Sequence, residues 1–129
     1  MAQPPKKLQR FLLSYPDVGH ASEALGDAAA TAGPLNRKTL QLVKLGISIG
    51  MRHEGAVHAL VRQAPEAGCT SDEVRHATVL AVTTLGFPSM FAAYTWVDEG
   101  LRDRSDATAQ SSLEAGNPGD DVLDSGMRS

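Results

Sequence analysis

A carboxylate and an imidazole stand four residues apart in this chain, at Glu54 and His58. On a helix, residues at this spacing lie on one face and are close enough to share a hydrogen bond. Such a bond holds the imidazole in one tautomer, and the pair can then transfer a proton near neutral pH. We therefore predict an acid–base site here. The alternative is an ordinary surface or interface ion pair, which has the same spacing.

A metal site is not expected around this pair. In the His-Glu-x-x-His signature of zinc proteases, two histidines four residues apart share a helical face. Here His53 and His58 are five residues apart, and Val57 stands where the second histidine would have to be. The two imidazoles would point in different directions, so no helix-borne zinc site is predicted.

Other side chains could border the same site. His76 approaches the pair if its helix packs beside that of Glu54, and is otherwise an exposed histidine. Large side chains recur further along the chain, at Met90, Phe91, Tyr94 and Trp96. They could line a small apolar pocket over the pair, or belong to the core or to a subunit interface.

Cys69 is the single cysteine of the chain. No internal disulfide or Cys-x-x-Cys redox pair can therefore form. Cys69 lies beside Thr70, at the start of a predicted helix, where the pKa of a thiol can be lowered. Because a resolving thiol is lacking, a structural role for Cys69 is the favoured interpretation.

Helices have to position these residues, and the spacing of apolar and helix-breaking residues predicts about six of them. We expect them over roughly residues 8–15, 18–31, 37–50, 52–67, 71–85 and 89–101. Asn36 is a favourable N-cap, and Thr70 with Glu73 forms a capping box. Gly86 and Pro88 end the fifth helix. No segment has the alternation of a strand, so the predicted class is all-α.

Composition divides the chain into three parts. Residues 1–8 are polar and contain two prolines, which predicts a flexible N-terminal arm. Residues 9–103 carry the helical pattern and form the predicted domain. Residues 104–129 are rich in Ser, Asp, Gly and Ala, which predicts a disordered C-terminal tail.

The charge and the apolar content exclude several classes of protein. The net charge is −3, and no basic stripe with interleaved aromatic residues marks a nucleic-acid surface. The apolar runs are too short or too polar to span a bilayer, and the N-terminus has no apolar signal core. We therefore expect a cytoplasmic protein that binds neither nucleic acid nor membrane.

Four segments follow one another in a characteristic order, at Leu35–Leu42, Glu54–Arg62, Ala67–Val74 and Gly86–Pro88. In type and spacing they resemble the carboxymuconolactone decarboxylase and alkylhydroperoxidase-D superfamily. The resemblance implies an all-α domain around a central helical hairpin, assembled as a closed homotrimeric or homohexameric ring. The low aromatic content agrees, because a thin core leaves apolar surface to be buried between copies.

The peroxidase branch of this superfamily uses Cys-x-x-Cys-x-x-x-His. If its histidine is His58, then Met51 and Glu54 stand at the two cysteine positions, and neither can form a disulfide. The chain therefore resembles the decarboxylase branch, whose members act in aromatic catabolism. That likeness implies loss of carbon dioxide from a small carboxylated lactone without a cofactor, which leaves a dienolate to be stabilised and protonated.

The resemblance implies that His58 donates this proton and that Glu54 orients it or acts as a base. An anionic substrate also needs a cation, and Arg52 and Arg62 are the nearest. Further candidates for contact with the substrate are His76, Phe87 and Met90.

Two departures from the family pattern bear on the substrate. Gln41 and His76 stand where decarboxylases often have glutamates, so the substrate need not be the lactone itself. Two other functions stay open. One is a non-catalytic oligomeric accessory or binding protein on the same scaffold. The other is a peroxidase or redox protein that uses Cys69, which the absent cysteine pair disfavours.

Overall fold

A computed structural model describes residues 4–115 of the chain. These residues form helices and connecting turns, and they contain no strand. The helices are α1 (Lys6–Ser14), α2 (Pro16–Ala30), α3 (Arg37–Gly50), α4 (Glu54–Gln63), α5 (Ser71–Val79), α6 (Val82–Leu85) and α7 (Phe87–Ala115). The all-α class is thereby confirmed. Within the described part, no helix combines the length and the apolar character that crossing a membrane requires.

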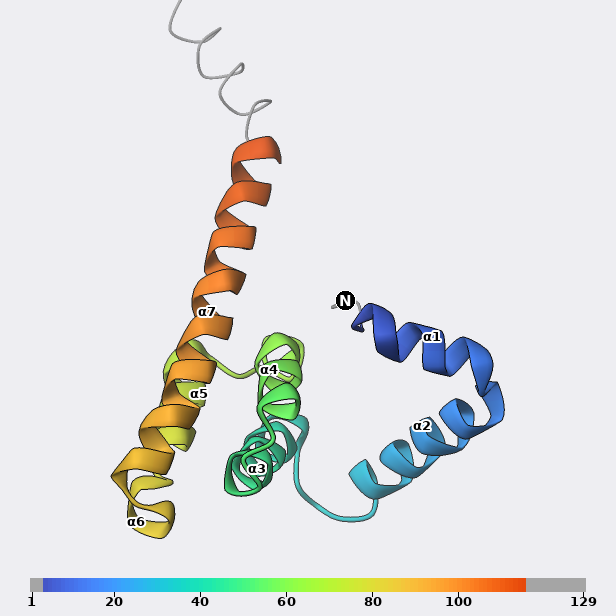
Figure 1. The fold of residues 1–129 in the computed structure, drawn as a ribbon, viewed down its shortest axis with the longest axis horizontal. Coiled ribbons are helices and arrows are strands. Elements are labelled where there is room, and N and C mark those ends of the chain that lie inside the picture. Colours follow the sequence, from blue (N-terminus) through green and yellow to red (C-terminus); the bar gives the residue numbers. More distant parts are fainter. Residues whose placement is uncertain (1–3, 116–129) are drawn as a thin grey trace, which may run out of the picture.

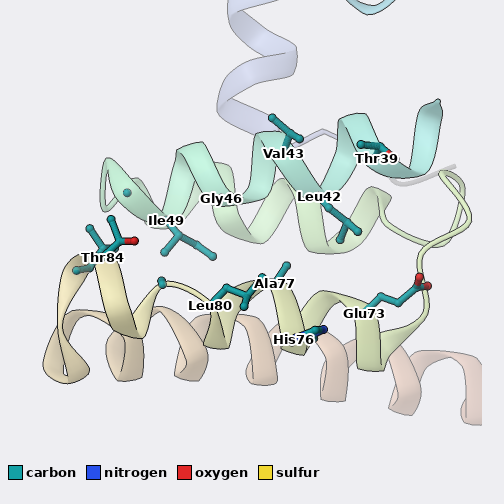
Figure 2. Close-up of a pocket in the computed structure, with 13 residues that line it drawn as sticks. Thr39, Leu42, Val43, Gly46, Ile49, Glu73, His76, Ala77, Leu80 and Thr84 are labelled. Carbon is teal, nitrogen blue, oxygen red and sulfur yellow. The ribbon is translucent and has the colours of Figure 1, made fainter. Parts of the chain in front are cut away.

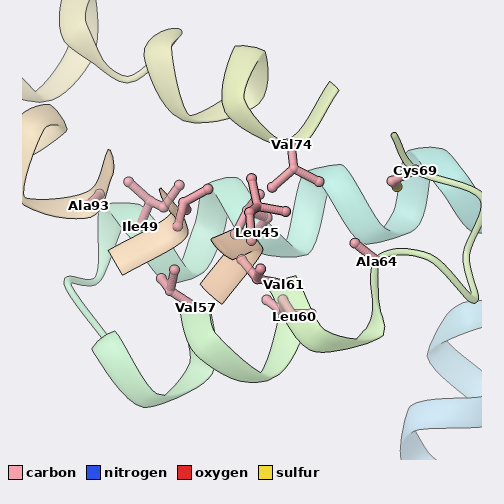
Figure 3. Close-up of a cluster of buried hydrophobic side chains, with 11 residues drawn as sticks. Leu45, Ile49, Val57, Leu60, Val61, Ala64, Cys69, Val74 and Ala93 are labelled. Atoms are coloured by element: carbon pink, nitrogen blue, oxygen red, sulfur yellow. The ribbon is translucent and has the colours of Figure 1, made fainter. Parts of the chain in front are cut away.

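Helices α3 and α4 pack against each other as a hairpin, and α5 and α7 pack on this hairpin (Figure 1). Their apolar side chains meet in one cluster, which Figure 3 shows in close-up. The fully buried side chains include Val57 and Val61 of α4 and Val97 of α7. Helices α1 and α2 lie to one side, pack mainly on each other, and contribute no buried residue.

Helices α4 and α7 approach each other closely at Gly100. A Cβ atom at this position would lie 2.9 Å from Cγ1 of Val61, which is fully buried and therefore has no room to move. Further along α7, the Arg104 guanidinium donates to the carbonyl oxygen of Val61 at 3.3 Å and to Oγ of Ser71 at 2.9 Å. One side chain thus joins α7 to both α4 and α5.

The predicted cap of α3 is confirmed, because Oδ1 of Asn36 accepts a hydrogen bond from the Thr39 N–H at 2.9 Å. Helix α4, in contrast, is shorter than the predicted 52–67. It begins at Glu54 because Nδ1 of His53 accepts from the Ala56 N–H at 3.0 Å and so acts as its N-cap. A histidine is not a usual capping residue, which is why the sequence did not indicate this start.

The predicted capping box of α5 is also confirmed. The Glu73 N–H donates to Oγ1 of Thr70 at 3.1 Å, and the Thr70 N–H donates to Oε1 of Glu73 at 2.9 Å. The second carboxylate oxygen of Glu73 pairs with the Lys38 ammonium of α3. This hydrogen bond to Lys38, with the backbone bond from Thr70, lowers the pKa of Glu73 to about 2.

The last helix runs further than the sequence analysis expects. It continues past Leu101 to Ala115, so the first residues of the expected tail are helical. The physical reason is that residues 101–115 contain neither glycine nor proline, and Pro118 is the next proline of the chain. At the other end, α1 begins at Lys6, within the expected arm. Residues 1–3 and 116–129 lie outside the described residues, and the domain limits 9–103 stay a prediction.

The ion pair of Glu73 makes stability depend on acid pH. Because folding lowers the pKa of Glu73 from 4.5 to about 2, the ionised group stabilises the fold above pH 4.5, and this contribution disappears as the pH falls toward 2. In urea titrations across this range, we expect Glu73→Gln to flatten the loss of stability. The control is Glu23→Gln, which removes an exposed carboxylate of α2. An unchanged profile in Glu73→Gln would contradict this account.

Candidate functional site

The predicted acid–base pair lies at the start of α4. Glu54 is the first residue of the helix and is exposed, whereas His58, one turn later, is half-buried. His58 lies three residues before Val61, whose side chain meets α7 at Gly100, so the imidazole lies on the side of α4 that faces α7. The two side chains form neither a hydrogen bond nor an ion pair with each other in the described structure.

The turn before Glu54 has an unusual backbone. The Arg52 N–H donates to the carbonyl oxygen of Ile49, and the His53 N–H donates to that of Ser48, both at 3.0 Å. These bonds form a Schellman motif, in which the residue after the C-cap adopts the left-handed conformation. That residue is usually glycine, but here it is Arg52, with φ of 56°. For a residue with a Cβ atom this conformation costs about 1–2 kcal/mol.

The side chain of Arg52 reaches across to α7, where its guanidinium donates to Oγ of Ser89. The two residues border a small cavity of about 250 Å³. Its lining is Ile49, Arg52, Pro88, Ser89, Ala92 and Trp96. Sequence reasoning missed Ser89, and only its place just after the Gly-Phe-Pro turn could have drawn attention to it.

A larger, open groove of about 560 Å³ lies between α3 and the α5–α6 segment (Figure 2). Its walls are mostly apolar, and the polar side chains on its α5 wall are Glu73 and His76. His76 faces α3 across this groove, opposite the wall that includes Leu42. His76 is exposed, which is the alternative given for it in the sequence analysis, and neither Glu54 nor His58 lines this groove.

A third cavity, of about 670 Å³, separates α2 from the α3–α4 hairpin. Arg37, Gln41 and Lys44 of α3 line it. Gln41, one of the departures from the family pattern, donates from Nε2 to the carbonyl oxygen of Leu60 at 2.8 Å. Its amide therefore ties α3 to α4. A glutamate at this position would need a proton to make the same bond.

The remaining predicted contacts lie apart from one another. Arg62 is exposed in the last turn of α4, at the opposite end from Glu54. Phe87 is 62% exposed and stacks on Phe91, with ring centroids 5.8 Å apart. Met90 is buried. Of the large side chains considered for a pocket, Trp96 lines the small cavity beside Arg52. The roles of these residues in binding stay predictions.

Cys69 is a buried thiol, 6% exposed. Burial is the main cause that raises its pKa above 9.0, and the charge of Glu73 acts in the same direction. At neutral pH it is therefore protonated, which is the unreactive form. Among residues 4–115, no three His, Cys, Asp or Glu side chains gather as the ligands of a metal ion would.

The sequence matches the model of a known family over the residues that form α2 to α6 and the first part of α7. Residues 16–99 match the carboxymuconolactone decarboxylase family, which is more than half of the chain. The protein therefore belongs to the carboxymuconolactone decarboxylase family. Among curated proteins, none matches the chain closely enough to serve as a relative. The resemblance of the four sequence segments to this family is thereby confirmed.

The raised pKa of Cys69 leads to a test of its reactivity. We expect alkylation by iodoacetamide at pH 7 to be slower, by about 10-fold or more, than that of free cysteine, because the thiolate is scarce and access is restricted. Mass spectrometry of the intact protein follows the reaction, and urea-unfolded protein is the control. Alkylation as fast as in the unfolded chain would contradict the buried position of this thiol.

The left-handed backbone of Arg52 leads to a test of stability. We expect Arg52→Gly to be more stable than Arg52→Ala by about 1 kcal/mol in urea unfolding, because only glycine adopts this conformation without a Cβ clash. Both variants lose the contact with Ser89, so the comparison isolates the backbone. If the alanine variant were equally stable, the strain at this position would be disproved.

Proposed function

We propose that this protein is a cofactor-independent lyase that acts in the cytoplasm on a small carboxylated organic acid or lactone, by decarboxylation or proton transfer. One observation carries the proposal beyond family membership. Arg52 lies in the turn between α3 and α4, and its positive charge borders a small cavity. In the chain, Glu54 follows two residues later, and His58 follows one helical turn after Glu54. An anion-binding group and an acid–base pair are therefore borne by one short segment.

The proposed reaction begins with an anionic group of the substrate bound at Arg52. Loss of carbon dioxide leaves the electron pair of the broken bond on the substrate, where conjugation spreads it as a dienolate. His58, as the imidazolium, then donates a proton to the reacting carbon. Glu54 orients the ring and stabilises its positive charge through a hydrogen bond that forms when both rotamers turn toward each other.

The assembly that we propose is a homotrimer or a homohexamer. Large apolar side chains remain exposed on α3 and at the C-terminal end of α5, among them Ile47 at 56% and the C-cap residue Leu80 at 61%. Leu80 also lines the open groove between these helices. Apolar surface of this kind is typical of subunit interfaces. A neighbouring copy would also exclude water from Glu54 and His58, of which Glu54 is exposed in the single chain.

The accessory function is the second candidate, and a specific observation favours it. Glu54 is exposed, it forms no bond with His58, and neither residue lines any of the three cavities. On this alternative the pair affects only stability or assembly. A thiol peroxidase is disfavoured, because Met51 and Glu54 stand at the cysteine positions and Cys69 is buried and protonated.

Replacement of the proposed proton donor separates these two functions. In a screen of small unsaturated carboxylic acids and lactones for release of carbon dioxide, we expect His58→Ala to lower kcat by roughly 100-fold or more. Its sedimentation should equal that of the wild type. The matched control is His20→Ala, on the exposed face of α2, which should retain full turnover. An active His58→Ala enzyme would refute the acid–base role, and a wild type inactive on every compound would favour the accessory function.

A further inference from the structure

We infer that the cavity between the α3–α4 corner and α7 binds the carboxylate of a small, flat, conjugated acid, anchored by Arg52 and Ser89 against the indole of Trp96. The inference rests on the proposed function, since it names the substrate class of that site and adds two residues to it. Four observations support it: the hydrogen-bond donors at the cavity, the charge of Arg52, the side chains that form the walls, and the backbone conformation of Arg52.

The two donors are already arranged side by side. A guanidinium has five N–H donors, of which the bond to Oγ of Ser89 uses one. Because the Ser89 oxygen is the acceptor in this bond, its own hydroxyl hydrogen stays available. A carboxylate has two oxygens and accepts from neighbouring donors of this kind, with an arginine as the preferred partner. The mutual bond thus holds both donors in place before the ligand arrives.

The charge of the cavity is not compensated within the described chain. Ion pairs among the described residues include those of Lys38 with Glu73, of Arg75 with Asp72 and Asp98, and of Arg102 with Asp98. Arg52 forms no ion pair with a carboxylate of residues 4–115, and its side-chain partner is the neutral Ser89. An anion at the cavity would therefore meet a full positive charge rather than an existing ion pair.

The walls select for shape and size. Apart from the two donors, the lining consists of the indole of Trp96 and the apolar side chains of Ile49, Pro88 and Ala92. An aromatic wall favours flat ligands, because rings and conjugated systems stack on it. The volume of about 250 Å³ lies below the roughly 300–1,000 Å³ that is typical of pockets for drug-sized molecules. A single ring or a short conjugated chain with one carboxylate fits these limits.

The backbone of Arg52 is the fourth observation. Glycine would close α3 without the cost of a left-handed residue with a Cβ atom. Strained backbone of this kind is concentrated at binding and catalytic sites. Ile49, which forms part of the cavity wall, is only 2% exposed and anchored in the core. The guanidinium of Arg52 therefore projects from a corner that is anchored in the core, as a preorganised binding site requires.

The chain provides its own reporter for the test, because Trp96 is its single tryptophan. We expect benzoate to change the fluorescence of Trp96 in a saturable manner, and benzamide, the neutral analogue, to cause no such change. Arg52→Gln should raise the Kd for benzoate roughly 10-fold or more, and Ser89→Ala roughly 3- to 10-fold. Arg52→Lys keeps the positive charge but loses the paired N–H donors of the guanidinium. Its Kd for benzoate should lie between those of the wild type and Arg52→Gln.

Arg10→Gln is the matched control, since it removes an exposed arginine of α1 outside the cavity, and its Kd should equal that of the wild type. Calorimetry on the same samples confirms that the fluorescence reports binding, and circular dichroism confirms that each variant is folded. The inference is overturned if folded wild type shows no saturable binding of benzoate, if benzamide binds equally well, or if Arg52→Gln binds benzoate like the wild type.

The same titration distinguishes the inference from the proposed function. His58 does not line the cavity, so His58→Ala should bind benzoate with the wild-type Kd while it loses turnover. If benzoate binding depends on Arg52 but turnover does not depend on His58, the binding site stands and the proposed reaction fails. If turnover depends on His58 but the Kd for benzoate is unchanged in Arg52→Gln, the proposed reaction stands and the inferred binding site fails.

Discussion

Two backbone hydrogen bonds, from Arg52 to Ile49 and from His53 to Ser48, close the end of α3 within a single turn. The rest of the structure depends on this closure. It reverses the chain so that α4 packs back on α3, and it leaves His53 in place to cap α4. It also aims the side chain of Arg52 at α7 rather than along α3. The core hairpin and the candidate binding cavity therefore have one origin.

The features of the fold that could be predicted from the sequence are those that local chemistry determines. Asn36 caps α3, and Thr70 with Glu73 caps α5, because each cap is a hydrogen bond between residues three apart. Gly86 separates the last two helices because its φ of 87° suits a residue without a Cβ atom. The start of α4 could not be predicted, because an arginine in the left-handed position and a histidine cap both lack a common signal.

The candidate site was predictable only in part, for a different reason. The spacing of Glu54 and His58 is a property of one helix, and the sequence contains it in full. The contact of Arg52 with Ser89 joins the turn between α3 and α4 to α7, which is far away in the chain, so it requires the packing of α4 on α7. The sequence left open whether His76 approaches the pair or is an exposed histidine, and the structure has it exposed, beside the groove between α3 and α5. Which face a helix turns to its neighbour depends on the whole core.

Arg104 has a consequence for where this domain can be cut. Its guanidinium donates to a carbonyl oxygen in the last turn of α4 and to a hydroxyl at the start of α5, from a position beyond the predicted end of the domain. A chain that ends at Asp103 would keep every described residue of the apolar core. It would nevertheless lose these two hydrogen bonds, which join α7 to α4 and to α5. The choice of a truncation point therefore has to take account of this polar contact as well as of Leu101, the last side chain that the structure describes as buried.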